Sequence, residues 1–315
     1  MIEINKDELR NLIVSGVSGV SGEELNSKYD YSGIEDMSGL LSDATEITEV
    51  PYLNLSSVES VSSMFYNCSS LVDVPLLSLR GVSDSSKMFA GCSSLQMVSL
   101  KDTFDVVDIS DMFSGCVSLT GVIGLNTSGA NFADRLFYKC LKMMSIPELD
   151  FSSVRFADGV FEGCSSLVDV GDLDLSSAES VRRIFKSCIH LEKVGNLKLD
   201  LVRNAGGMFS RCHRLKAIPS LSLPSSDAAI SMFIDCFSIE ELSLDLPSVE
   251  DISYSFNGCK SLKHLNVVLP KGYFCQDALF DKCFSLRDIN PYEFRCDISS
   301  CCLPWLVENY PELYV

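Results

Sequence analysis

"MFYNCSSL", residues 64–71, decides the fold because the same pattern recurs along the chain. It returns as "MFAGCSSL" at residues 88–95 and "MFSGCVSL" at 112–119, and again as "VFEGCSSL" from Val160 and "SFNGCKSL" from Ser255. Ten cysteines hold the same place in this unit, and successive ones lie 24 residues apart in every step but one of 23. A fixed period between roughly 20 and 50 residues predicts stacked repeats.

Each repeat carries two apolar patterns. Phe stands three residues before each of the ten cysteines, and Leu, Met or Ile stands three residues after it. This spacing predicts one or two turns of a tight helix, whereas the alternation of "LSL" (77–79) or "LDL" (173–175) predicts a short strand. One such unit cannot bury its apolar face alone, so the copies are expected to stack into a continuous core. The sequence therefore predicts an α/β repeat solenoid of about ten to eleven coils, capped at both ends.

The predicted core contains the repeated Phe, Cys and Leu. It includes Phe65, Cys68, Leu71, Phe89, Cys92, Leu95, Phe113, Cys116, Leu119, Phe161, Cys164 and Leu167. The favoured interpretation of the cysteines is packing, because a free Cys is a small buried hydrophobe that fits beside a large Phe. Parallel side chains on neighbouring coils disfavour disulfides, although disulfides and a metal or redox ladder stay open. In a degenerate first copy Ala44 replaces Cys, which supports the packing interpretation.

The chain is expected to divide into four parts. These are residues 1–22, a helix and a flexible Ser/Gly linker; 23–60, a cap with the degenerate first repeat; 61–295, the solenoid; and 296–315, a C-terminal cap. Asn5 and Glu8 have the spacing of a capping box at the start of a helix. Two roles are open for residues 1–22: a tethered arm for self-association or assembly, or a segment that folds back on the first coil.

Composition limits the class of partner. Of 315 residues, 46% are hydrophobic and 22% charged, as in a soluble folded protein. The net charge of -18 repels nucleic acid and anionic lipid at long range, so neither is an expected partner. No segment approaches the roughly 18 apolar residues of a spanning helix, so no membrane insertion is expected. The acidic start lacks the pattern of a secretory signal.

A basic island interrupts the acidic chain. Residues 182–216 hold nine basic residues against Glu192 and Asp200. The candidate partner-binding patch consists of Arg182, Arg183, Lys186, Lys193, Arg211, Arg214 and Lys216. Stacking of coils is expected to bring these groups together, either as a solvated face or as a docking patch for an acidic partner. The acidic N-terminal region is one candidate for that partner, within one molecule or between copies.

No catalytic set is visible. The histidines His190, His213 and His264 occupy different positions in their repeats, and no phosphate loop, nucleophile elbow or paired-His metal motif occurs. The C-terminal cysteines lack two Cys-x-x-Cys pairs, so structural zinc is disfavoured. The expectation is a protein that is not an enzyme and has no cofactor and no metal.

The unit "MFxGCSSLxxVxxLxLSSVxSV", over residues 37–290, resembles the BspA-like class of leucine-rich repeats of bacterial and protozoan surface proteins. It is similar also to the repeats of mycoplasma-type lipoproteins. The resemblance implies a right-handed solenoid with a strand and a short helical segment per coil. It also implies binding to host-cell or matrix proteins or to other cells, and a cell-surface location.

Two functions follow as expectations. The first is a non-enzymatic scaffold that recognises or adheres to a protein or a cell-surface glycan. The alternative is a structural component of a larger assembly, such as a bacteriophage virion, attached through residues 1–22. The lack of a visible export signal favours a cytoplasmic or virion location, whereas the resemblance favours the cell surface, so the sequence leaves the location unknown.

Overall fold

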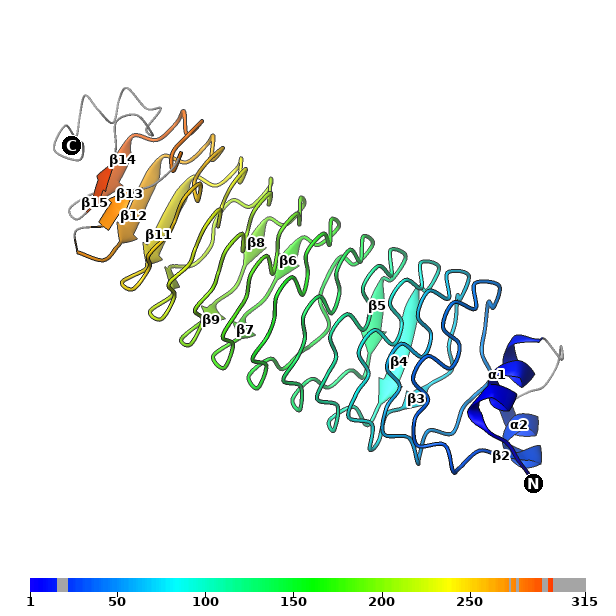
Figure 1. Ribbon diagram of the computed structural model, residues 1–315. Coiled ribbons are helices and arrows are strands. Elements are labelled where there is room, and N and C mark those ends of the chain that lie inside the picture. The colour runs from blue at the N-terminus through cyan, green and yellow to red at the C-terminus, as the bar shows by residue number, and fades with distance from the viewer. Residues whose placement is uncertain (16–21, 272, 276–277, 291–293, 297–315) are drawn as a thin grey trace. The chain divides into compact units, whose positions relative to one another are not determined.

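The computed structural model describes residues 1–15, 22–271, 273–275, 278–290 and 294–296. The chain forms two compact units, Met1–Phe151 and Ser152–Val315. Within each unit the chain winds through successive coils, so that residues one repeat apart lie side by side (Figure 1). The expected C-terminal cap over residues 296–315 lies, apart from Cys296, outside the described residues.

The first unit contains the two helices of the described chain and a set of short strands. Its elements are β1 (Ile2–Glu3), α1 (Lys6–Val14), α2 (Gly22–Lys28), β2 (Tyr29–Asp30), β3 (Leu77–Ser78), β4 (Met97–Lys101) and β5 (Gly121–Ile123). β1 pairs with β2, and β4 lies between β3 and β5. All of these pairs are parallel, and Val98 faces Val122, one repeat further along the chain.

The second unit repeats this arrangement with more strands. Its elements are β6 (Asp169–Val170), β7 (Leu173–Asp174), β8 (Lys193–Val194), β9 (Leu197–Lys198), β10 (Leu221–Ser222), β11 (Glu241–Asp245), β12 (His264–Val268), β13 (Tyr273–Cys275), β14 (Asp288–Asn290) and β15 (Phe294–Cys296). The strand order is β10-β11-β12-β14 in the largest sheet, with separate pairs β6-β8, β7-β9 and β13-β15. Every pair is parallel, as a solenoid requires.

The expected helical turn in each coil is not confirmed. Alternate N–H groups make turn bonds to the third residue before, as Cys68 does to the Phe65 carbonyl at 3.1 Å. The N–H groups between them point to the next coil, as Phe65 does to the Met88 carbonyl at 2.8 Å. Ser63 and Asn67 have φ of 57°, in the left-handed region, which a right-handed helix excludes. The spacing of three therefore reflects a string of tight turns that are hydrogen-bonded laterally.

The repeated Phe side chains form a stacked row in the core of each unit. Phe65 and Phe89 have ring centroids 5.1 Å apart, and Phe185 and Phe209 have centroids 5.5 Å apart, with nearly parallel rings. The Phe, Cys and Leu residues named above as the predicted core are fully buried. Because each ring covers its neighbour, removal of one Phe would leave a cavity within the row.

The coil cysteines pack as free, buried thiols. Cys92 donates its thiol hydrogen to the Phe65 carbonyl of the preceding coil, with Sγ 3.0 Å from the oxygen, and Cys116 bonds in the same way to Phe89. Cys is therefore the small residue that also supplies a donor to the neighbouring coil. The first coil has no such coil before it, which gives a physical reason for Ala44 at the equivalent position.

Burial makes these thiols unreactive. It raises the pKa of Cys68 to about 11 and that of Cys116 to about 12, because the thiolate loses its hydration. At pH 9, two pKa units below the first value, only about 1% of Cys68 is thiolate. We therefore expect iodoacetamide at pH 9 to leave the coil cysteines of the native protein unmodified, as mapped by mass spectrometry.

The same reaction in urea is the control and should modify all of them. Rapid labelling of Cys116 in the native protein would contradict the burial of the thiol row.

Helix α1 folds onto the first coil. Asn5 and Glu8 form the expected capping box, each side chain accepting a hydrogen bond from the other's backbone N–H at 2.9–3.0 Å. Leu9 is fully buried. The guanidinium of Arg10 donates to the carbonyls of Leu40 at 2.6 Å and Ser42 at 3.0 Å.

These two carbonyls have a special place in the first coil. One repeat later, the carbonyls of Met64 and Tyr66 accept N–H groups from the preceding coil, at 2.8 and 2.7 Å. Leu40 and Ser42 have no preceding coil, so Arg10 supplies the two donors that such a coil would provide.

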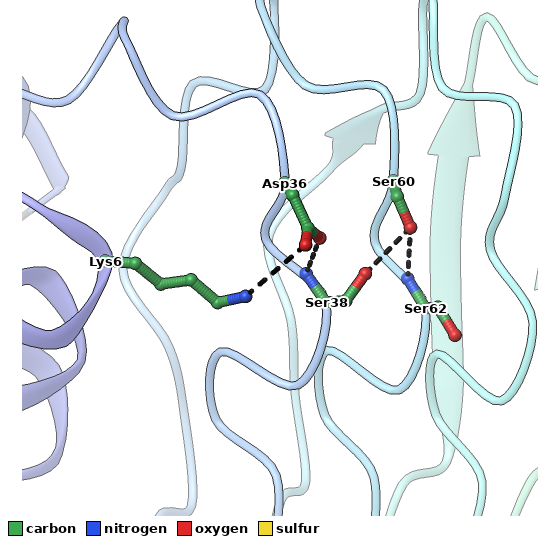
Figure 2. Close-up of polar contacts among 5 residues, drawn as sticks. All are labelled: Lys6, Asp36, Ser38, Ser60 and Ser62. Carbon is green, nitrogen blue, oxygen red and sulfur yellow. Dashed lines mark hydrogen bonds and ion pairs between the residues drawn. The ribbon is translucent and has the colours of Figure 1, made fainter.

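A polar row starts beside the same helix (Figure 2). The ammonium of Lys6 lies 3.9 Å from Asp36, which accepts the Ser38 N–H at 2.7 Å. Ser38 in turn contacts the Ser60 hydroxyl at 2.8 Å. Hydrogen bonds from Ser38, more than the charge of Lys6, lower the pKa of Asp36. Lys6 is therefore a peripheral contact of α1.

We expect Arg10→Met to lower the free energy of unfolding by about 1–3 kcal/mol, because it removes two charge-assisted hydrogen bonds and leaves two carbonyls without donors. The matched control is Lys6→Met on the same helix, which loses only a long, exposed ion pair and should cost less than about 0.5 kcal/mol. Urea unfolding followed by circular dichroism measures both. Equal effects of the two changes would refute the capping role of Arg10.

Candidate binding groove in the second unit

A groove of about 420 Å³ crosses three coils of the second unit. We call it the basic groove; its lining residues are Arg182, Arg183, Lys186, Asn204, Gly206, Gly207, Ser210, Arg211, Ala228, Ile230, Ser231 and Ile234. This volume is within the range of about 300–1,000 Å³ that is usual for ligand sites.

The groove exists because one coil has small side chains between two coils with larger ones. Gly206, Gly207 and Ser210 form its floor. The equivalent residues one repeat earlier are Arg182, Arg183 and Lys186, and those one repeat later are Ile230, Ser231 and Ile234. One wall is therefore basic, whereas the other is largely apolar.

The backbone of the floor has no N–H group to spare. Each N–H from 205 to 211 has an acceptor; for example, Gly207 donates to the Ile230 carbonyl at 2.8 Å and Arg211 to the Ile234 carbonyl at 2.7 Å. The remaining N–H of Gly206 donates to the Asn204 side chain at 3.0 Å. A ligand in the groove must therefore be recognised by side chains.

Two of the groove arginines adopt a backbone conformation that favours glycine. Arg183 has φ of 57° and Arg211 has φ of 62°. At the position of Arg211 four other copies have glycine, such as Gly115 and Gly258, and five have a side chain with positive φ, such as Lys139. A side chain in this region costs about 1 kcal/mol or more, so a basic side chain is held here at some expense of stability.

Most lysines of this unit are neutralised by an acid one coil away. Lys193 lies 2.7 Å from Asp169, and Lys198 lies 2.5 Å from Asp174. The pKa of Asp174 falls to about 2, chiefly because Lys198 donates a hydrogen bond to it. Lys186 in the groove is also paired, at 2.9 Å from Glu162.

The groove arginines differ from these lysines. Arg182, Arg183 and Arg211 are exposed, and among the described residues no carboxylate lies within 4 Å of their guanidinium groups. The groove thus carries three guanidinium groups that have no ion-pair partner among the described residues.

The structure divides the predicted patch into two parts. Arg182, Arg183, Lys186 and Arg211 line the groove. The other three residues, Lys193, Arg214 and Lys216, are not among its lining residues; Lys216 lies 2.7 Å from Glu192. This pair, with a smaller effect of the Arg214 charge, lowers the pKa of Glu192.

Sequence reasoning missed the floor and the apolar wall. The signal was present in "RNAGGMFS", residues 203–210, where two glycines replace the arginine pair of the preceding copy. Ile230 was equally visible in the sequence, because it stands at a position that holds Ser in several other copies, such as Ser62 and Ser253; the structure shows it to be 40% exposed.

Neither a metal centre nor a membrane helix is found in the described part of the chain. No group of three or more His, Cys, Asp or Glu side chains there is arranged to hold a metal ion. No helix among the described residues is long and apolar enough to cross a bilayer.

The repeats match a known family. The family described as "BspA type Leucine rich repeat region (6 copies)" matches residues 83–216, 130–263 and 183–302, which together cover more than half of the chain. The chain belongs to the BspA-type leucine-rich repeat family. A second family, a Mycoplasma protein of unknown function, matches residues 22–100, so this part of the chain is also similar to mycoplasma proteins.

Several solved structures, the following three among them, are similar to this BspA-type chain, whereas no curated protein matches it. A leucine-rich repeat protein of T. pallidum is 28% identical and covers 54% of this chain and 75% of its own, with a TM-score of 0.40. A leucine-rich cell surface protein of Faecalibacterium prausnitzii is 19% identical, with coverage of 77% and 76% and a TM-score of 0.40. A leucine-rich repeat protein of Eubacterium ventriosum is 16% identical, with coverage of 78% and 73% and a TM-score of 0.43.

We expect Arg211→Gly to leave the free energy of unfolding unchanged or to raise it by up to about 1 kcal/mol, because glycine relieves the left-handed backbone. The matched control is Arg214→Gly, at an exposed position without a positive φ, which should cost about 0.5–1 kcal/mol. Urea unfolding measures both. A loss above about 1 kcal/mol for Arg211→Gly would instead assign Arg211 a structural role.

Proposed function

We propose that this protein is a non-enzymatic binding scaffold, a BspA-type solenoid that recognises a protein or glycan ligand through the basic groove. The observation that carries the proposal is the set of three arginines around the groove that have no ion-pair partner among the described residues. A guanidinium offers two parallel donors to a carboxylate, sulfate or phosphate, so this surface suits an anionic ligand.

The lack of ion pairs supports the same conclusion. Arg183 and Arg211 make no ion pair with a described acid, whereas Arg135, at the position of Arg183 two copies earlier, lies 2.7 Å from Asp111. The charge of the groove arginines is therefore better explained by a ligand than by an ion pair within the chain.

Adhesion at a cell surface is the biological setting that we propose. It is supported by membership in the BspA-type family, and one similar structure is itself described as a leucine-rich cell surface protein. The net charge of -18 opposes a general affinity for nucleic acid, so the groove is proposed for a short anionic ligand and not for a long polyanion.

Attachment to a larger assembly through residues 1–22 stays a prediction. The contacts of α1 favour capping, because Leu9 and Arg10 are both engaged with the first coil. An assembly role would have to use the exposed parts of this segment, such as Met1 and Ile2.

The test is binding of the full chain to two defined arrays, one of acidic and basic peptides and one of neutral and anionic glycans. We expect ligands on at least one array, and their affinity should fall as the salt concentration rises. The double variant Arg182→Ser/Arg183→Ser should bind them at least about tenfold more weakly. These serines occur at the equivalent positions Ser62 and Ser63, so the fold should tolerate them.

The matched control is Lys193→Ser, which removes a paired lysine outside the groove and should change the affinity less than about twofold. No ligand on either array, or equal loss in the control, would refute the proposal.

A further inference from the structure

We propose that the ligand of the basic groove is an extended acidic peptide, with carboxylates on Arg182, Arg183 and Arg211 and one apolar side chain against Ile230 and Ile234. This inference rests on the proposed function and narrows its ligand from protein or glycan to a polypeptide segment of stated chemistry.

The width of the groove selects an extended chain. The distance between stacked Phe rings gives the spacing of the coils. It is 5.5 Å between the basic wall and the floor (Phe185–Phe209) and 5.3 Å between the floor and the apolar wall (Phe209–Phe233). The two walls are thus about 10 Å apart, which is close to the distance between stacked β-sheets. A helix with its side chains is about 10–12 Å across and does not fit between walls that carry side chains of their own.

The charge selects carboxylates. The three arginines lie on the basic wall and at one end of the floor, and their guanidinium groups are free of described acids. Lys186 contributes less, because it is half-buried and paired with Glu162. An acidic segment supplies the missing partners, and guanidinium–carboxylate pairs are the strong, bidentate kind.

The apolar wall separates a peptide from a glycan. Ile230 is 40% exposed and Ile234 is half-buried, at positions where other copies have serine. A sulfated or carboxylated glycan would pair with the arginines but has no aliphatic side chain to cover these two residues. A leucine-like side chain placed over Gly206 would cover them and lose its own contact with water, whereas the space over Gly207 is taken by the Arg183 side chain.

The mode of recognition is also restricted. Because every N–H of the floor already has an acceptor, the peptide cannot add as a further strand to the backbone of this coil. Affinity must therefore depend on the sequence of the peptide, through its charges and its single apolar residue.

The experiment uses three fluorescent peptides, Glu-Glu-Leu-Glu-Glu, Glu-Glu-Ser-Glu-Glu and Lys-Lys-Leu-Lys-Lys, with heparin as the anionic glycan probe. Fluorescence anisotropy of the full chain measures the peptides, and competition measures heparin. We expect the leucine-containing acidic peptide to bind about fivefold or more tightly than its serine counterpart. The acidic chain can attract the basic peptide, but removal of the groove arginines should not weaken that binding.

Two variants separate the contributions. Arg182→Ser with Arg183→Ser should weaken both acidic peptides by at least about tenfold. The double variant Ile230→Ser/Ile234→Ser should bind the leucine and serine peptides equally well, with its affinity for the serine peptide unchanged. The chain has serine at the equivalent positions Ser253 and Ser210, and thermal unfolding confirms that each variant is folded.

The outcomes distinguish this inference from the proposed function. Binding of heparin without either acidic peptide would overturn the inference and leave the binding scaffold intact. Equal affinity for the two acidic peptides would also overturn it, because the apolar wall would then have no role.

Sedimentation tests whether the protein self-associates. If it does, and if the arginine variant abolishes this association, the ligand is a second copy of this chain, and the proposal of a free peptide is overturned. Failure of all probes together with failure of both arrays would overturn the proposed function itself.

Discussion

Lateral hydrogen bonding between coils is the constraint on which the rest of both units depends. Alternate N–H groups along each turn segment donate to the carbonyls of the next coil, while those between them close tight turns within their own coil. This arrangement requires left-handed residues such as Ser63 and Asn67 at regular positions. It also fixes the distance at which the Phe rings stack and the cysteine thiols reach the preceding coil. The backbone hydrogen bonds and the repeated apolar side chains therefore depend on each other.

The architecture was largely predictable because its signal repeats. The pattern of Phe65, Cys68 and Leu71 recurs in register, with Phe and Cys in all ten copies and Leu in eight, and this regularity outweighs any single ambiguous residue. The local conformation was less predictable, since a spacing of three fits both a tight helix and a string of turns. Only the φ values of residues such as Asn67 separate the two, and serine, lysine and arginine at the same positions give no warning of a left-handed backbone.

The candidate site was predictable only in part. The density of basic residues indicated Arg182, Arg183 and Arg211, but it also included Lys193 and Lys216, which acids one coil away neutralise. Charge counting along the sequence does not reveal such pairs, because their partners are 24 residues distant. The groove itself depends on the absence of side chains at Gly206 and Gly207, and an absence is noticed only when copies are compared position by position.

The contact of Arg10 with the carbonyls of Leu40 and Ser42 also bears on how a repeat protein ends. A first coil without a neighbour presents the same row of acceptors that every inner coil offers to the next chain segment, and such an open edge invites a foreign strand. The guanidinium of Arg10 occupies two acceptors of that row and so caps part of the edge of the first coil. A side chain thus makes part of this edge unavailable to a foreign strand without any change of the repeat pattern within the unit.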